Sequence, residues 1–155
     1  MLGNRFSVID ISEAHNMYLC DLVVRYRFKE KCASVRNVNF PLPRPPEFSE
    51  RPIQEEKLKA ERGETSEMLE TAISESVAAI EDDGAEVIVL GCSGAFWMQP
   101  HLQKRLSALG WEVPVLEGYR CAIEQAKTLV NLGVDASGLM LPNDKPKKWR
   151  RRKFV

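Results

Sequence analysis

The chain has 155 residues, of which 44% are hydrophobic and 28% charged, and it carries no net charge at neutral pH. This length and composition are typical of one globular domain with enough chain to bury a hydrophobic core. No apolar run reaches the roughly 18 residues of a membrane span, and the N-terminus lacks a signal-peptide pattern. We therefore expect a cytoplasmic protein without a membrane partner.

Basic residues gather at the C-terminal end. Seven of the 22 Lys and Arg residues lie within 145–155, which contains no acidic residue, so the remaining chain has 15 basic and 22 acidic residues. An acidic body is not typical of a dedicated nucleic-acid-binding protein. We expect a domain over residues 1–139 and a flexible basic tail over 140–155. Nucleic-acid contact by the segment Lys147–Lys153, which mixes basic residues with an aromatic one, is the less favoured alternative.

The first elements in chain order are a strand over Arg5–Asp10 and a helix from Ser12 or Glu13 to about Phe28. The breadth of this helix's apolar face predicts deep burial. A short strand is expected within Ala33–Phe40. The proline-rich and charged segment 41–64 is predicted to be a loop insertion, with room for a helix in Glu55–Arg62.

The remaining elements alternate between helices and strands. We expect a helix capped by Thr65 or Ser66, a buried strand over Glu86–Leu90, a helix from Pro100 to Gly110, a strand over Val113–Leu116 and a helix over Tyr119–Leu132. Strands that alternate with helices predict an α/β fold, a parallel sheet flanked by helices on both faces.

The principal candidate for chemistry is Cys92. It follows Gly91 at the carboxyl end of the predicted buried strand, where α/β sheets bind their ligands. A thiol there can act as a nucleophile or as an acid and base. The backbone N–H groups of residues 93–99 and the Ser93 hydroxyl are suited to bind a carboxylate or an enolate oxygen. The alternative is a small buried cysteine that only packs.

The other cysteines stand in different contexts. Cys20 and Cys121 fall within predicted helices, Cys32 lies near a strand start, and we expect all three to be packing thiols. No cysteine spacing is typical of a metal site, and the chain has only two histidines, His15 and His101. We therefore expect no metal site and no disulfides.

Several segments resemble the aspartate/glutamate/hydantoin racemase superfamily, and hydantoin racemases most closely. The longest is Glu81–Gly94, which is similar to the family's second cysteine motif together with its preceding helix and strand. Arg5–Ile9 and Ala33–Asn37 resemble the opening strand of the family's second half and the segment after its first helix. Pro114–Gly118 and Leu132–Ser137 resemble the family's C-terminal region.

The resemblance implies one half of a two-lobed α/β fold and a cofactor-independent racemase. In that family two cysteines face each other across a cleft, and they remove and return the proton alpha to a carbonyl without a metal or pyridoxal phosphate. Cys92 corresponds to the second of these thiols. Ser93, Gly94, Ser12 and Glu117 are the substrate-binding residues that the resemblance indicates, on a hydantoin, an amino acid or a related carboxylic acid.

The chain departs from the family pattern in three respects. The family's first half, with the first cysteine, has no counterpart here, so we expect a homo-oligomer or a partner that supplies it. Asp10-Ile11-Ser12 stands where the family has hydroxyl residues. Phe96-Trp97 is bulkier than the family pattern and is expected to pack as core, with a narrowed substrate pocket as the alternative. Besides the racemase, a one-cysteine decarboxylase of the same superfamily and a non-catalytic interaction module remain open.

Overall fold

The computed structural model describes residues 2–40 and 51–134. In chain order the elements are β1 (Phe6–Asp10), the 3-10 helix η1 (Glu13–His15), α1 (Asn16–Arg25), β2 (Cys32–Asn37), α2 (Arg51–Glu61), α3 (Glu67–Glu81), β3 (Val87–Leu90), the 3-10 helix η2 (Ser93–Met98), α4 (Gln99–Ala108), β4 (Val115–Leu116) and α5 (Gly118–Asn131). One compact unit extends to Tyr119 and contains the whole sheet, and a second begins at Arg120. The predicted basic tail, residues 140–155, lies outside the described residues.

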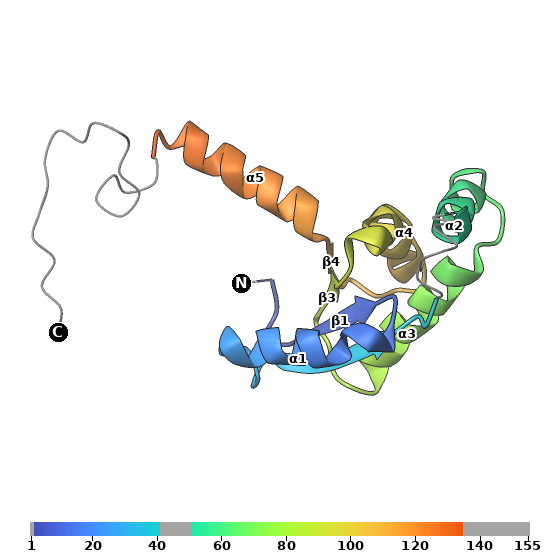
Figure 1. The fold of residues 1–155 in the computed structure, drawn as a ribbon, viewed down its shortest axis with the longest axis horizontal. Helices are drawn as coiled ribbons and strands as arrows, with labels where there is room; N and C mark the ends of the chain where they lie inside the picture. The colour runs from blue at the N-terminus through green and yellow to red at the C-terminus, as the bar shows by residue number, and fades with distance from the viewer. Residues whose placement is uncertain (1, 41–50, 135–155) are drawn as a thin grey trace, which may run out of the picture. The chain divides into compact units, whose positions relative to one another are not determined.

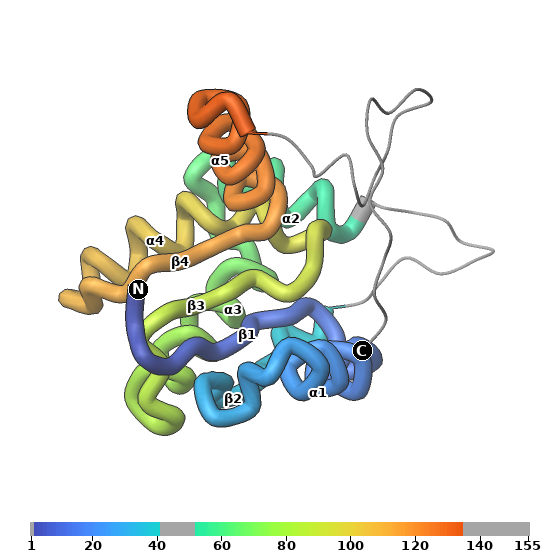
Figure 2. Tube along the Cα trace, turned by 90° about the vertical axis from the view of Figure 1, so that its left-hand side faces the viewer, coloured from blue at the N-terminus to red at the C-terminus, as the bar shows by residue number. Residues whose placement is uncertain are grey.

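The four strands form one parallel sheet in the order β2-β1-β3-β4. The chain moves from β1 to β2 in one direction, and then passes back over β1 to β3 and on to β4. Because such crossovers are right-handed, α1 covers one face of the sheet, and α3 and α4 cover the other (Figure 1, Figure 2). The predicted α/β fold with helices on both faces is confirmed. The strand order reverses between β1 and β3, so their carboxyl ends border the crevice where ligands bind in such sheets.

The hydrophobic core lies between the sheet and the α3–α4 layer. Ile9 of β1 and Ile88 of β3 are fully buried, as are Met68, Leu102 and Leu106 on the helices. The apolar face predicted for α3 points into this core. Ser66 is the N-cap, and its side chain accepts a hydrogen bond from the Leu69 N–H at 3.3 Å. These side chains fix β1 and β3 against each other, which matters for the site below.

The first predicted helix differs from expectation. It is split into η1 and α1, and Leu19 is its only buried residue. Met17 is 86% exposed and Tyr18 63%, so the prediction of deep burial is wrong. The reason is position, because α1 packs beside the edge strand β2, where few apolar partners are available to it.

Residues 51–61 form helix α2, so the helix for which residues 55–62 left room is present, and it begins four residues earlier than expected. Glu56 lies on the α2 face that packs on α3, and it is 5% exposed. Its carboxylate accepts hydrogen bonds from the Ser66 hydroxyl at 2.8 Å and the Met68 N–H at 3.1 Å, and it pairs with Lys59. The first turn of a helix has free N–H groups that favour a carboxylate. The sequence of α2 is polar, so it gave no apolar pattern from which this contact could be predicted. Residues 41–50 are outside the described chain.

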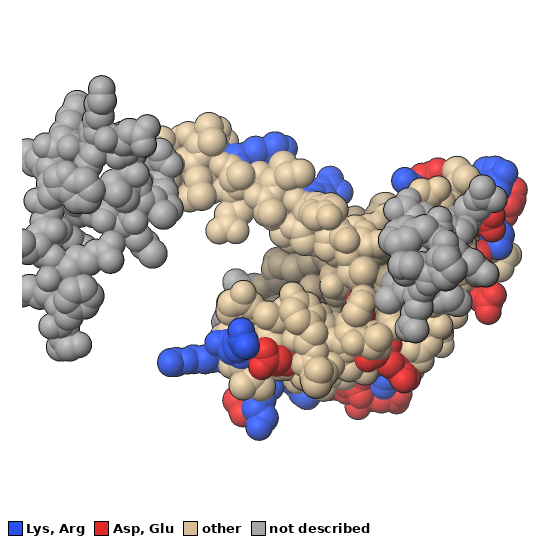
Figure 3. Space-filling view, viewed as in Figure 1, with Lys and Arg blue, Asp and Glu red and all other residues tan. Residues whose placement is uncertain are grey.

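None of the described helices has the length and apolar character needed to cross a bilayer. On the face shown in Figure 3, acidic and basic side chains are mixed along the border of the first unit. In the same view the basic side chains of α5 lie along its upper edge, and the surface visible below them is uncharged.

Candidate active site

The close approach of β1 and β3 brings the ends of the two strands together. The strands pair in parallel, with Ile9 opposite Leu90, and the Gly91 N–H extends the ladder with a 2.9 Å hydrogen bond to the Ile9 carbonyl. A Cβ on Gly91 would lie 2.8 Å from Val8 Cγ1 and 3.1 Å from Asp10 Oδ1. Glycine is therefore required here by space, and it lets the chain pass Asp10 and place Cys92 beside it.

Asp10, the last residue of β1, is fully buried. Its Oδ2 lies 2.6 Å from Nδ1 of His15, whereas its Oδ1 has no hydrogen-bond partner among the described residues. Because a carboxylate only accepts hydrogen bonds, the contact assigns a proton to Nδ1. In the neutral imidazole this leaves Nε2 with the lone pair, available to a proton.

The turn that returns His15 to Asp10 is short. Ser12 caps η1, and its hydroxyl accepts a 3.2 Å hydrogen bond from the Ala14 N–H. Three further backbone units then place the imidazole, which is about one third exposed, over the carboxylate. The His15 imidazole thus lies between bulk solvent and the buried carboxylate of Asp10.

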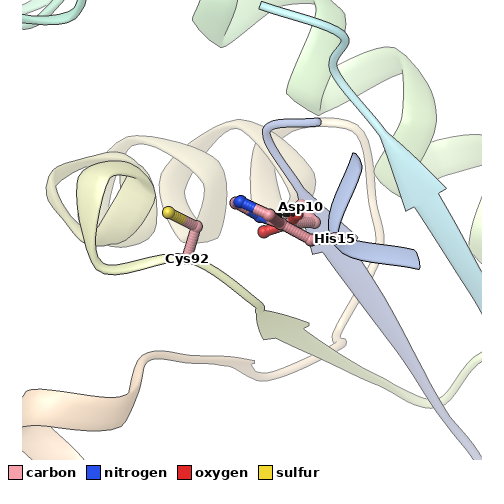
Figure 4. A group of neighbouring side chains, drawn as sticks. All are labelled: Asp10, His15 and Cys92. Atoms are coloured by element: carbon pink, nitrogen blue, oxygen red, sulfur yellow. Dashed lines mark hydrogen bonds and ion pairs between the residues drawn. The ribbon is translucent and has the colours of Figure 1, made fainter. Parts of the chain in front are cut away.

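Cys92 completes a group of three side chains (Figure 4). One donor atom each from Asp10, His15 and Cys92 lies within 4.8 Å of the others. The cysteine is half-buried, and burial and then the Asp10 charge raise the pKa of its thiol, while the nearby Gly94 and Ala95 amides lower it. The net direction is upward, so the protonated thiol, a proton donor, is favoured at neutral pH.

The predicted binding residues Ser93 and Gly94 lie next to the sulfur. Ser93 is exposed and begins η2. A Cβ on Gly94 would be 3.8 Å from Cys92 Sγ and 3.8 Å from Ile53 Cδ1, which is ordinary contact. Glycine at this position therefore leaves open a volume of one methyl group between the thiol and α2.

The other two predicted binding residues have local hydrogen bonds. Ser12 caps η1 and lies in the same connection as His15. Glu117 follows β4, and its Oε2 accepts a 2.8 Å hydrogen bond from the Tyr119 N–H at the start of α5. Phe96 contacts Tyr119 edge to face, with ring centroids 4.9 Å apart, and is partly buried against the core, as expected. Cys20 and Cys121 are exposed, so their prediction as packing thiols is wrong.

Sequence reasoning missed the Asp10–His15 pair. In the sequence Asp10 stands out only as a departure from the family's hydroxyl residues, and His15 only as one of two histidines. The topology of the fold could have predicted this neighbourhood, because the first strand of such a sheet lies centrally, beside the strand that precedes Cys92. An acid at the end of the first strand is therefore a neighbour of a residue that follows the cysteine strand.

The model of the family described as Asp/Glu/hydantoin racemase matches residues 1–126. The chain belongs to this family. It is 32% identical over 136 residues to a hydantoin racemase of Rhizobium meliloti, covering 88% of this chain and 48% of that protein. It is 30% identical over 139 residues to a hydantoin racemase of Pseudomonas sp. (strain NS671), covering 90% of this chain and 47% of that protein. The chain thus spans about half the length of these curated relatives.

Solved structures of the family have the same fold. An allantoin racemase from Pseudomonas fluorescens matches with a TM-score of 0.66 at 26% identity, over 95% of this chain and 54% of that one. An allantoin racemase from Klebsiella pneumoniae matches with a TM-score of 0.65 at 23% identity, over 88% of this chain and 47% of that one. The parallel sheet with its flanking helices is therefore the racemase fold.

Proposed function

We propose that this chain carries one side of the active site of a cofactor-independent racemase that acts on hydantoins, amino acids or related carboxylic acids. Cys92 is one acid/base, and it exchanges a proton with the substrate carbon alpha to a carbonyl. The observation that carries the proposal is the position of Cys92 at the β1–β3 switch point, in a chain that belongs to the racemase family.

The surroundings of Cys92 suit both directions of proton transfer. The raised pKa of the thiol favours the protonated form that returns a proton to a carbanion. For the reverse step the thiol must first lose its proton, and the His15 imidazole is a base in the same group of side chains. The hydrogen bond from His15 to Asp10 orients the ring.

Substrate contacts are assigned to the residues around the sulfur. The Ser93 hydroxyl and the backbone N–H groups that follow Cys92 are suited to an enolate or carboxylate oxygen. Gly94 leaves space for the substrate beside the thiol. Ser12 and Glu117 complete the proposed binding set from the connections after β1 and β4. No cofactor is needed for this chemistry.

Racemisation requires a second acid/base on the opposite face of the planar intermediate. The chain spans about half of its curated relatives, and α5 is amphipathic with none of its side chains buried. We propose that an association, with a second copy or with a chain that supplies the remaining half, completes the cleft and covers the apolar side of α5. The cytoplasmic location expected from the sequence stays a prediction.

The alternative enzyme is a one-cysteine decarboxylase of a malonate-type acid. One observation favours it. Among the described cysteines, Cys92 alone follows the carboxyl end of a strand at the point where the strand order of the sheet reverses. Such a reaction needs one protonating thiol and an oxyanion pocket, and no second base. Carbon dioxide release from a substituted malonate, without hydrogen exchange of hydantoins, would select it. If the chain catalyses neither reaction, the non-catalytic interaction module is the remaining hypothesis.

The test is solvent hydrogen exchange. The chain is incubated in D₂O with a 5-substituted hydantoin, and loss of the C5 proton signal is followed by NMR. We expect exchange above the protein-free rate, its loss in Cys92→Ala, and its retention in Cys20→Ala, which alters an exposed cysteine on α1. Exchange that continues undiminished in Cys92→Ala would remove Cys92 from the mechanism.

A further inference from the structure

We propose that Asp10, His15 and Cys92 form a binding site for a first-row divalent metal ion of the zinc type. The three donors come from the end of β1, from η1 and from Cys92, the N-cap residue of η2, so the fold and not the sequence spacing brings them together. This inference concerns binding by the chain alone and does not depend on racemase activity.

The donor types select the metal class. A thiolate and an imidazole are preferred by zinc and its neighbours, whereas magnesium and calcium prefer oxygen ligands only. Thiolate and carboxylate together carry two negative charges, which neutralise a divalent ion. Three protein ligands leave at least one coordination position for water or another small ligand, as in open zinc sites.

The spacing of the donors fits one ion. Zinc bonds of about 2.0–2.3 Å place two ligands of a tetrahedral ion about 3.3–3.8 Å apart. In the structure no two of the three donor atoms are more than 4.8 Å apart. Closing this difference requires a shift of about 1 Å, within the range of side-chain rotation at Cys92 and His15, neither of which is fully buried.

An independent observation points to a ligand at the same place. Asp10 is fully buried, and its Oδ1 has no hydrogen-bond partner within the described part of the chain. A buried carboxylate oxygen without a partner is costly, and an ion or an ordered water is a common explanation. The residue that bears this oxygen is the one that already holds His15.

Binding and proton transfer exclude each other at this site. When the ion binds, the Cys92 S–H bond breaks, its proton passes to solvent, and a sulfur–metal bond forms. The ion also replaces the hydrogen bond between His15 and Asp10. The Nδ1 proton passes by way of solvent to Nε2, and Nδ1 and the Asp10 carboxylate oxygen, 2.6 Å apart in the structure, each bind the ion. The sulfur lone pair that would accept a proton is then held by the metal. The ion is therefore an inhibitor of the thiol, and it is not a cofactor of the proposed racemase.

The test uses the full chain, reduced and stripped of metal with a chelator. Cobalt(II) is titrated in as a coloured substitute for zinc, and the thiolate-to-cobalt charge-transfer band is recorded. We expect saturation at one equivalent, loss of the band in Cys92→Ser, and an affinity at least about 10-fold weaker in His15→Gln. The controls Cys20→Ser and His101→Gln should match the unaltered chain. Circular dichroism confirms that each variant is folded.

A second measurement needs no variant. Zinc should slow the alkylation of Cys92 by iodoacetamide at least about 10-fold. The exposed Cys20, mapped in the same digest, should react at an unchanged rate. The proposal is overturned if no charge-transfer band forms, if the band survives in Cys92→Ser, if His15→Gln binds as tightly as the unaltered chain, or if zinc leaves the alkylation of Cys92 unchanged.

Discussion

The two glycines on either side of Cys92 should respond in opposite ways to a single added methyl group. In Gly91→Ala the new Cβ would lie 2.8 Å from Val8 Cγ1, a distance that real Cβ contacts essentially never show. It would also lie 3.1 Å from Asp10 Oδ1, which is closer than most Cβ contacts. The strand pair β1–β3 or the Asp10 side chain must move. Overpacking of this kind costs about 1–3 kcal/mol. For a chain of this size that corresponds to a melting temperature lower by roughly 2–12 °C.

Gly94→Ala is the matched control. Its Cβ would meet Ile11, Cys92 and Ile53 at 3.7–3.8 Å, which is ordinary contact. Because alanine restricts the unfolded chain more than glycine does, the variant should be as stable as the unaltered chain or more so, by up to about 1 kcal/mol. Thermal unfolding followed by circular dichroism compares the two. Equal melting temperatures for Gly91→Ala and the unaltered chain would refute the close approach of the strands.

Two further perturbations test the contacts around the sheet and α5. Glu56→Ala removes the partner of the Ser66 hydroxyl and the Met68 N–H, and it should lower the free energy of unfolding measured in urea by about 1–3 kcal/mol. An unchanged free energy would show that α2 does not pack there. Burial raises the pKa of Glu56, but its hydrogen bonds outweigh this and lower it, so its stabilisation is present at neutral pH and fades as the pH falls below the unfolded value of about 4.3. The difference between the variant and the unaltered chain should therefore shrink on acidification, and a constant difference would contradict this. Val130→Asp on the apolar side of α5 should reduce the mass measured by light scattering, whereas Thr128→Asp on the opposite side should not. Equal masses for the unaltered chain and both variants would argue against association through α5.

The sequence was sufficient for the architecture because its signals are local. The apolar periodicity of α3, its Ser66 cap and the strand that precedes Gly91 each depend on neighbouring residues, and the structure confirms them. The burial of α1 was mispredicted for the opposite reason. The apolar positions of α1 can be recognised in the sequence. Whether they are buried depends on the place of α1 in the fold, which is at the edge of the sheet.

The site was predictable only in part. Cys92 could be found because a strand, a glycine and a family motif coincide at one place. Asp10 and His15 could not be found by spacing, since 77 positions or more separate them from Cys92 in the sequence. Only the pairing of β1 with β3 makes them neighbours. The contact of Glu56 with the start of α3 was hidden similarly, because a buried charged residue does not contribute to an apolar pattern.

The most direct test of the account is the stereochemistry of hydrogen exchange. Cys92 alone acts from one side of the substrate, so the chain carrying Val130→Asp, which is expected not to associate, should exchange the C5 proton of one hydantoin enantiomer in D₂O faster than it inverts that carbon. The two enantiomers are incubated separately with Val130→Asp, with the unaltered chain and with Cys92→Ala, and deuterium content and optical purity are measured together. The account predicts deuterium in one enantiomer and little inversion with Val130→Asp, and no exchange above background in Cys92→Ala. No exchange by the unaltered chain, or equal exchange by Cys92→Ala, would contradict it.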